Sequence, residues 1–196
     1  MAKEKISIVV PCYNEEEALP LFYKEICKVA KEMKVVDFEF LFINDGSKDR
    51  TLEILKEYAK KDKRVRFISF SRNFGKEAGM YAGLSNAVGD YVAIMDADMQ
   101  DPPEMIKVMY KSIKDEGYDC VALYTKSHDD YGFVRKFLTA CWYKLIGAIS
   151  SIKLFLINCE GRAKIIISVL SKASLISKVA FIFSFNCCSF SCSDKK

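Results

Sequence analysis

The chain has 196 residues, which is enough for one domain with its own hydrophobic core. Hydrophobic residues make up 51% of it and the net charge is only +4, so the composition gives little reason to expect a nucleic-acid partner. The eight cysteines form no Cys-x-x-Cys pair and no Cys/His spacing of a zinc site. The first residues show no signal-peptide pattern, so we expect a cytoplasmic protein with reduced thiols.

Short apolar runs alternate with amphipathic stretches from the first residues to about residue 124. The runs predict buried strands at 6–10, 38–43, 65–70, 91–95 and 119–124. Apolar residues at helical spacing predict helices at 18–33, 51–61, 76–88 and 103–116. This alternation predicts an α/β fold, with a mainly parallel sheet and helices on both faces.

Polar clusters follow four of the predicted strands. In open α/β sheets, ligands bind at the carboxyl ends of the strands, so we expect a functional site on this rim. The clusters are Asn14-Glu15, Asp45-Gly46-Ser47, Arg72 to Lys76, and Asp96 to Gln100.

Asp96 and Asp98 stand two residues apart at the end of a predicted strand, where alternation puts both carboxylates on one side. Two close carboxylates repel each other unless a cation lies between them. Mg²⁺ or Mn²⁺ suits such a place, because one or two carboxylates and substrate phosphates complete its shell. On spacing alone, a charged surface turn is an equally good interpretation, since Asp-x-Asp is a short pattern.

Arg72 and Lys76, on a neighbouring loop, would add positive charge next to such a metal. Metal and cationic side chains together suit a substrate whose leaving group is a diphosphate. The alternative is a solvated helix start. No Gly-x-Gly-x-x-Gly follows the first strand and no Walker A pattern occurs, which disfavours a dinucleotide-binding fold and a P-loop.

Four segments, in this order, resemble motifs of the family-2 glycosyltransferases. Within that family they are most similar to the polyprenyl-phosphate branch, the dolichol-phosphate mannose and bactoprenol glucosyl transferases. The segments are Val9-Val-Pro-Cys-Tyr-Asn-Glu15, Asn44-Asp-Gly-Ser-Lys-Asp-Arg-Thr51, Ser71-Arg-Asn-Phe-Gly-Lys76 and Met95-Asp-Ala-Asp-Met-Gln-Asp-Pro-Pro-Glu104.

The resemblance implies a GT-A-like fold and an inverting, metal-dependent hexosyltransferase of cell-wall or glycan biosynthesis. Its donor would be a UDP- or GDP-sugar and its acceptor a polyprenyl phosphate at the inner face of the membrane. The acceptor oxygen is already anionic near neutral pH, because a phosphate second pKa is about 6, so a dedicated general base is less needed.

The resemblance also assigns residues to roles. Donor binding falls to Pro11, Tyr13, Asn14, Glu15, Asp45, Gly46, Ser47 and Asp96. The metal ligands would be Asp96, Asp98 and Gln100, and the catalytic set Asp96, Asp98, Arg72 and Lys76. Lys126, His128 and Arg135 are weaker candidates for the acceptor phosphate.

The chain departs from the family pattern in two places. Asn44 stands where many members carry an Asp, which removes a charge but keeps hydrogen bonding. Thr125 and His128 stand where the branch usually has two arginines, and Lys126, His128 and Arg135 are the charges that could replace them. A plain loop residue is the alternative interpretation of His128.

We predict a nucleotide-sugar-binding domain at 1–150, ending in an amphipathic helix at 135–149, and an atypical Ser/Cys/Phe-rich tail at 151–196. After Asp130 the only acidic residues are Glu160 and Asp194. Our hypothesis is a frameshift or sequencing error near 150–160, which the other reading frames of the gene would test. Lysines interrupt the tail, so no clear transmembrane helix is expected; a helix at 165–185 on a membrane surface and a poorly packed tail both stay open.

Two rival functions remain. The chain could be a truncated, inactive fragment that only binds nucleotide or nucleotide sugar. It could also be a nucleotidyltransferase, but that class usually begins with a Gly-rich basic loop, which Val10-Pro-Cys-Tyr-Asn14 is not. The sequence leaves a homo-oligomer open.

Overall fold

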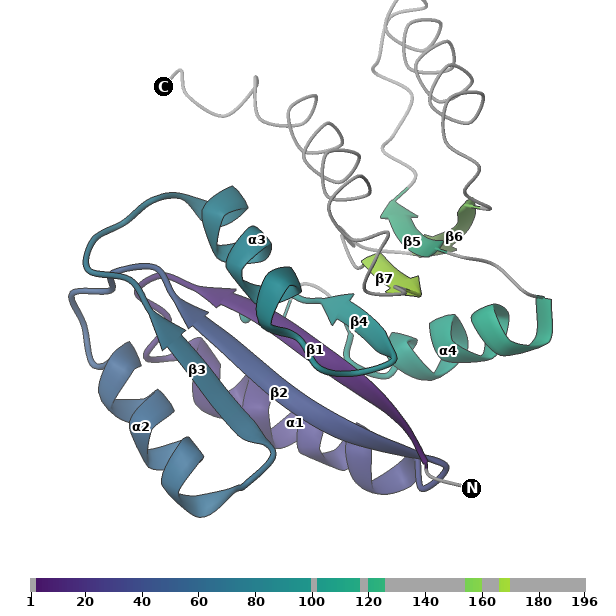
Figure 1. Cartoon of the computed structure of the whole chain (residues 1–196), viewed down its shortest axis with the longest axis horizontal. Helices are drawn as coiled ribbons and strands as arrows, with labels where there is room; N and C mark the ends of the chain where they lie inside the picture. The colour runs from purple at the N-terminus through teal and green to yellow at the C-terminus, as the bar shows by residue number, and fades with distance from the viewer. Residues whose placement is uncertain (1–2, 100–101, 117–119, 126–153, 160–165, 170–196) are drawn as a thin grey trace, which may run out of the picture.

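The computed structural model describes residues 3–99, 102–116, 120–125, 154–159 and 166–169. Within these ranges the chain forms one twisted sheet flanked by helices (Figure 1). The strands are β1 (Glu4–Cys12), β2 (Val36–Asn44), β3 (Val65–Ser69), β4 (Tyr91–Ile94), β5 (Cys120–Thr125), β6 (Leu154–Cys159) and β7 (Ile166–Val169). The helices are α1 (Ala18–Glu32), α2 (Thr51–Lys61), α3 (Lys76–Asn86) and α4 (Met105–Glu116).

The sheet order is β3-β2-β1-β4-β7-β5-β6. Strands β1 to β4 are parallel to one another, with Ile6 of β1 opposite both Phe38 of β2 and Tyr91 of β4. Strand β7 runs antiparallel between β4 and β5, and β6 is parallel to β5. The prediction of a mainly parallel sheet is therefore confirmed.

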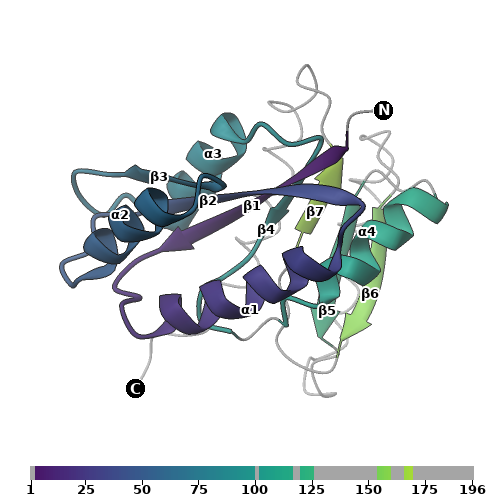
Figure 2. The same ribbon diagram turned by 90° about the horizontal axis from the view of Figure 1, so that it is seen from below.

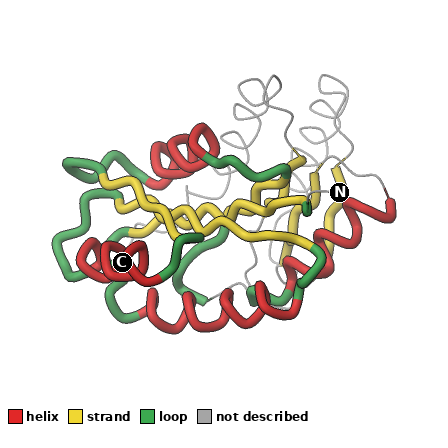
Figure 3. The backbone as a smooth tube through the Cα atoms, turned by 60° about the horizontal axis from the view of Figure 1, so that its bottom comes forward, coloured by secondary structure: helices red, strands yellow, loops and turns green. Residues whose placement is uncertain are grey.

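Helices cover both faces of the sheet (Figures 2 and 3). Alternate strand residues point to opposite sides, as the period of two requires. Ile8 and Phe40 belong to the core beneath α1, α2 and α4, whereas Val9 and Leu41 pack with α3. Helix α3 lies close to β1 because Gly83 has no side chain; a Cβ there would come within 2.2 Å of Val9 Cγ1.

The predicted elements are largely confirmed up to β5. Helix α2 has the predicted bounds, and β1 and β2 each extend one to two residues beyond theirs at both ends. Helix α3 ends two residues earlier than expected, at Asn86, and α4 begins at Met105 rather than residue 103. The N–H of Met105 donates to the carbonyl of Pro102 at 3.0 Å, so the two prolines form the turn that leads into α4.

The two strands beyond residue 150, β6 and β7, were not predicted. A helix starting at residue 165 is wrong over β7, which pairs with β4 from Ile166 to Val169. The physical reason is that consecutive β-branched residues fit a sheet position better than a helix. The helix predicted at 135–149 lies outside the described residues, and the domain boundary near 150 and the frameshift hypothesis stay predictions.

Among the described helices, none is both long enough and apolar enough to cross a membrane.

Candidate functional site

The carboxyl ends of the first three strands lie level with one another. Cys12 pairs with Asn44, and Asn44 with Ser69, in the last rung of the parallel ladder. The side-chain amide of Asn44 donates to Ser69 Oγ at 2.9 Å, and its oxygen accepts the N–H of Ser47 at 3.2 Å. Asn44 therefore ties two strands and a loop together with hydrogen bonds that need no charge.

The loops after β1 and β2 are bonded to each other. The N–H of Asn14 donates to Ser47 Oγ at 3.0 Å, and the N–H of Lys48 donates to Asn14 Oδ1 at 2.9 Å. Asn14 adopts a left-handed backbone (φ 56°), which asparagine tolerates better than most residues. The N–H of Glu15 donates to Thr51 Oγ1 at 2.9 Å. These contacts give Asn14 and Ser47 the role of holding the two loops in place.

Asp45 and Gly46 in turn hold the loop after β3. The Asp45 carboxylate, only 4% exposed, accepts the N–H groups of Phe74 and Gly75 at 2.7 and 2.9 Å. Gly46 has φ 67°, and a Cβ on it would lie 2.4 Å from the backbone carbon of Arg72. The backbone from Arg72 to Gly75 thus rests directly on the loop after β2, just before α3 begins.

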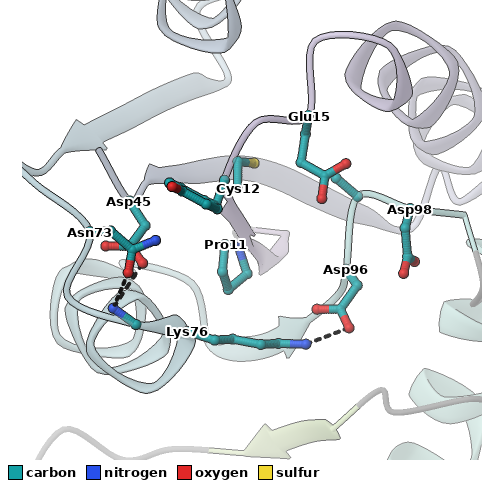
Figure 4. Close-up of a pocket in the computed structure, with 11 residues that line it drawn as sticks. Pro11, Cys12, Glu15, Asp45, Asn73, Lys76, Asp96 and Asp98 are labelled. Carbon is teal, nitrogen blue, oxygen red and sulfur yellow. Dashed lines mark hydrogen bonds and ion pairs between the residues drawn. The ribbon is translucent and has the colours of Figure 1, made fainter. Parts of the chain in front are cut away.

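These loops surround a pocket of about 260 Å³ at the carboxyl edge of the sheet (Figure 4). Seven predicted site residues line it: Pro11, Tyr13, Glu15, Asp45, Lys76, Asp96 and Asp98. Glu15, Asp96 and Asp98 lie on one side of the pocket and Asp45 and Asn73 on the other, with the Lys76 side chain spanning the two. The structure therefore brings together residues that are up to 87 positions apart (from Pro11 to Asp98).

Negative charge gathers on the β4 side of the pocket. Burial raises the pKa of Glu15, and the nearby carboxylates of Asp98, Asp96 and Asp49 raise it further. Lys76 acts in the opposite direction. Its Nζ lies 2.5 Å from Asp96 Oδ2, and the two side chains are 35% and 25% exposed. The pocket is thus a place where a cationic ligand, or a cation bound with an anionic ligand, is favoured.

The donor atoms in this pocket fit a hard divalent ion. Among the described residues, no group of three or more His, Cys, Asp or Glu side chains is placed to hold a metal ion. Asp96 and Asp98 nevertheless offer carboxylate oxygens on one loop, and Mg²⁺ commonly takes one or two carboxylates together with substrate phosphates and water. Asp96 and Asp98 are therefore the residues that would hold it; Gln100, the third predicted ligand, lies outside the described residues.

Other predicted site residues take different places. Asn14, Gly46, Ser47 and Arg72 are not among the residues that line the pocket. Arg72 is exposed, with its guanidinium carbon 4.8 Å from the centre of the Phe74 ring. The proposed acceptor residues, Lys126, His128 and Arg135, lie outside the described residues.

Four lining residues were not predicted: Cys12, Asn73, Gly75 and Ala97. All four lie inside the four segments that resemble family motifs. Their position within those segments was the signal that could have identified them. Cys12 is buried at the base of the pocket, where burial raises the pKa of its thiol well above the usual range. That thiol is therefore a neutral wall of the pocket and not a nucleophile.

Comparison with known families and sequences agrees with this geometry. The family model described as Glycosyl transferase family 2 matches residues 7–159. The chain is 42% identical over 150 residues to the bactoprenol glucosyl transferase of Shigella phage SfV, covering 76% of this chain and 48% of that protein. It is 42% identical over 146 residues to the uncharacterized glycosyltransferase YkcC of Bacillus subtilis, covering 74% and 45%. The chain spans about half the length of the curated relatives it matches.

Two solved structures share the fold. One is glucosyl-3-phosphoglycerate synthase from Mycobacterium tuberculosis, in complex with Mn²⁺, UDP and phosphoglyceric acid; it covers 84% of this chain and 56% of its own, with TM-score 0.58 and 21% identity. The other is the mannosyltransferase PcManGT from Pyrobaculum calidifontis with GDP-Man and Mn²⁺, which covers 66% and 38%, with TM-score 0.53 and 19% identity. These likenesses confirm the predicted GT-A-like fold.

Proposed function

Because the chain belongs to glycosyl transferase family 2, we propose that it moves a sugar, with inversion, from a nucleotide-diphosphate sugar to a polyprenyl phosphate. The observation that carries this proposal is the pocket at the sheet edge, where Lys76, Asp96 and Asp98 meet the Pro11–Glu15 loop. The names of relatives as bactoprenol glucosyl transferases support the class of acceptor. The donor nucleotide is UDP or GDP.

The described residues would divide the work as follows. Tyr13, which is 42% exposed, and Pro11 offer apolar surface to the nucleoside. Asp96 and Asp98 would hold Mg²⁺ or Mn²⁺, which, when bound, neutralises the negative charge of the departing diphosphate. The Lys76 ammonium lies in the same pocket and adds charge stabilisation to the leaving group.

The acceptor needs little activation from the protein. A phosphate oxygen is anionic near neutral pH, so the chain has to position it opposite the leaving group and exclude water, without removing a proton. Arg72, exposed next to the pocket, and Lys126, His128 and Arg135 are our candidates for contacts to the phosphate groups. A lipid acceptor would place this edge of the sheet against a membrane surface, on the cytoplasmic side.

The test is calorimetric titration of the purified chain with UDP and with GDP, each with and without Mn²⁺. We expect one nucleotide to bind at least tenfold more tightly with the metal, and Asp98→Asn to remove that gain, since each carboxylate supplies part of the metal shell. Lack of binding by both nucleotides under all conditions would contradict the proposed donor site.

The second function is nucleotide binding without transfer: within the described part of the chain, the residues that line the pocket all lie between Pro11 and Asp98, the stretch that carries the donor-site motifs. Incubation with a radiolabelled UDP-sugar or GDP-sugar and a short polyprenyl phosphate separates the two. Labelled lipid indicates transfer, and donor binding without labelled lipid indicates a binding fragment.

A further inference from the structure

The position of Lys76 is unusual for a lysine. It is the first residue of α3, where the partial positive charge of the helix end disfavours a cation. The favourable charge in the first turn of α3 comes from the next residue, Glu77. The Lys76 charge therefore does not stabilise the helix end. The side chain instead runs across the pocket to Asp96 on the loop after β4 (Figure 4). The interactions of the Lys76 side chain are therefore with the pocket and not with its own helix.

The loop before α3 holds Lys76 in this place. Asp45 binds the two backbone N–H groups that come immediately before it, those of Phe74 and Gly75. Gly46 lets the same loop approach without a clash at Arg72. The backbone at the start of the lysine is therefore held by the loop after β2, while its four-carbon side chain can still move its ammonium.

The Lys76 ammonium forms an ion pair with Asp96, one of the two carboxylates of the proposed metal site. Its Nζ lies 2.5 Å from Asp96 Oδ2, so one oxygen of this carboxylate already has a cationic partner. Two cations on one carboxylate also repel each other. A divalent ion that binds Asp96 therefore weakens the ion pair between this carboxylate and the Lys76 ammonium.

We infer that Lys76 is a built-in counter-ion of Asp96 that competes with the divalent cation when no donor is bound, and that moves to the donor diphosphate when metal and donor enter together. The inference rests on the proposed function and deepens it. A diphosphate offers the ammonium a charge-assisted hydrogen bond at least as strong as the carboxylate it leaves. No covalent bond changes; one ion pair is exchanged for another.

This exchange couples the two ligands. Metal alone has to weaken the Lys76–Asp96 pair, and a diphosphate alone meets the crowded carboxylates of Glu15, Asp96 and Asp98. When both bind, the diphosphate gives the Lys76 ammonium a new partner, and the metal ion offsets the charge of the carboxylates. By linkage, the factor by which metal tightens nucleotide binding equals the factor by which nucleotide tightens metal binding.

The experiment is a titration of Mn²⁺ into the full chain without nucleotide, with free Mn²⁺ followed by its electron paramagnetic resonance signal. Lys76→Met keeps most of the side-chain length and removes the charge; we expect it to tighten Mn²⁺ binding roughly three- to tenfold, in line with a partly exposed ion pair. Lys76→Arg keeps a cation at the site and should bind Mn²⁺ like the wild type.

Lys114→Met is the matched control. Lys114 pairs with Glu4 at 2.9 Å and is exposed to a similar degree, but it lies on α4, away from the pocket. The change in net charge is the same as in Lys76→Met, so a general electrostatic effect would tighten Mn²⁺ binding in both. We expect no change in Lys114→Met beyond about 1.5-fold.

With the preferred nucleoside diphosphate present, we expect the opposite effect of Lys76→Met, a weaker binding of the ligand. Lys76→Met should bind the nucleotide at saturating Mn²⁺ about tenfold more weakly, because a phosphate contact is lost. If Lys76→Met without nucleotide binds Mn²⁺ no more tightly than the wild type does, Lys76 does not compete with the metal and the inference is overturned. The proposed function would still stand in that case, provided that the wild type binds nucleotide more tightly with the metal. Absence of nucleotide binding in the wild type and in all variants would remove both.

Discussion

Carboxyl groups at the two ends of the sheet have pKa values shifted in opposite directions. At the carboxyl edge, Glu15 lies near Asp96 and Asp98, and burial together with these neighbours raises its pKa. Toward the amino end, Glu39 is 3% exposed and accepts hydrogen bonds from Ser7, Arg66 and the N–H of Val88. Burial raises the pKa of Glu39, but these hydrogen bonds outweigh it, so that its pKa lies below the usual range.

Glu4 repeats the second pattern. Its carboxylate accepts hydrogen bonds from Lys114 at 2.9 Å, Tyr110 at 2.7 Å and Tyr91 at 3.1 Å, and these hold its pKa below the usual range. The amino end of the sheet thus satisfies its acidic groups internally, which stabilises the fold. At the carboxyl edge, by contrast, the carboxylates of Glu15, Asp96 and Asp98 lie close enough together to raise the pKa of Glu15, which favours a ligand that brings positive charge.

The largest effect that this comparison predicts is on turnover. We expect Asp96→Asn to lower metal-dependent sugar transfer by at least about hundredfold, because a neutral amide binds a divalent ion poorly and leaves the diphosphate less stabilised. Transfer to a polyprenyl phosphate at saturating Mn²⁺ measures it. Thermal unfolding serves as the control and should show little change, since losing the partly exposed ion pair with Lys76 and relieving the crowding with Glu15 and Asp98 act in opposite directions.

The next effect is on stability at the amino end. Glu39→Ala should lower the free energy of unfolding by about 3 kcal/mol, because it leaves the buried hydroxyl of Ser7 and the N–H of Val88 without their acceptor. Urea unfolding measures the change. Glu25→Ala is the matched control, since Glu25 pairs with the exposed Lys28 on the surface of α1 and should cost about 0.5 kcal/mol or less. Equal costs in the two variants would contradict the contrast drawn between buried and surface pairs.

A smaller loss is expected at Glu4. Tyr110→Phe removes the hydroxyl that donates to Glu4 at 2.7 Å but keeps the ring, which packs edge-on against Tyr91. We expect a loss of about 1 kcal/mol in urea unfolding. Burial and the hydrogen bond to Glu4 also raise the pKa of Tyr110 to about 12, so the ultraviolet titration step that is lost in Tyr110→Phe should lie at a higher pH than the titration of free tyrosine. A lost titration step at the pH of free tyrosine would count against the bond.

The smallest effect has the opposite sign. Glu15→Gln should raise the stability at pH 7 by about 0.5 kcal/mol or less, since it removes one of the crowded charges. A carboxyl group whose pKa is raised in the folded state favours folding below its ordinary value of 4.5, and this contribution is lost as the pH rises through the raised pKa. The gain from Glu15→Gln should therefore appear only above that window. Glu17→Gln, at an exposed position two residues on, is the control; a gain of the same size there would show that the pocket plays no part.

The sequence by itself determined the α/β class, the alternation of strands and helices up to β5, and the edge of the sheet at which the pocket lies. It could do so because these depend on local patterns: alternation in strands, helical spacing, and polar residues directly after strand ends. The Asp96-x-Asp98 pair and the loops at Pro11–Glu15 and Asp45 were visible for the same reason, and all contribute to the pocket.

Only the tertiary structure decided which charges meet. That Lys76 pairs with Asp96, that Arg66 and Ser7 satisfy Glu39, and that Tyr110 reaches Glu4 depends on strand register and on loops bonded to other loops. The insertion of β7 between β4 and β5 was also invisible, because strand pairing joins residues about 75 positions apart, such as Val92 and Ser168. Local patterns say which face a residue occupies, whereas the partner on that face is set by distant chain segments.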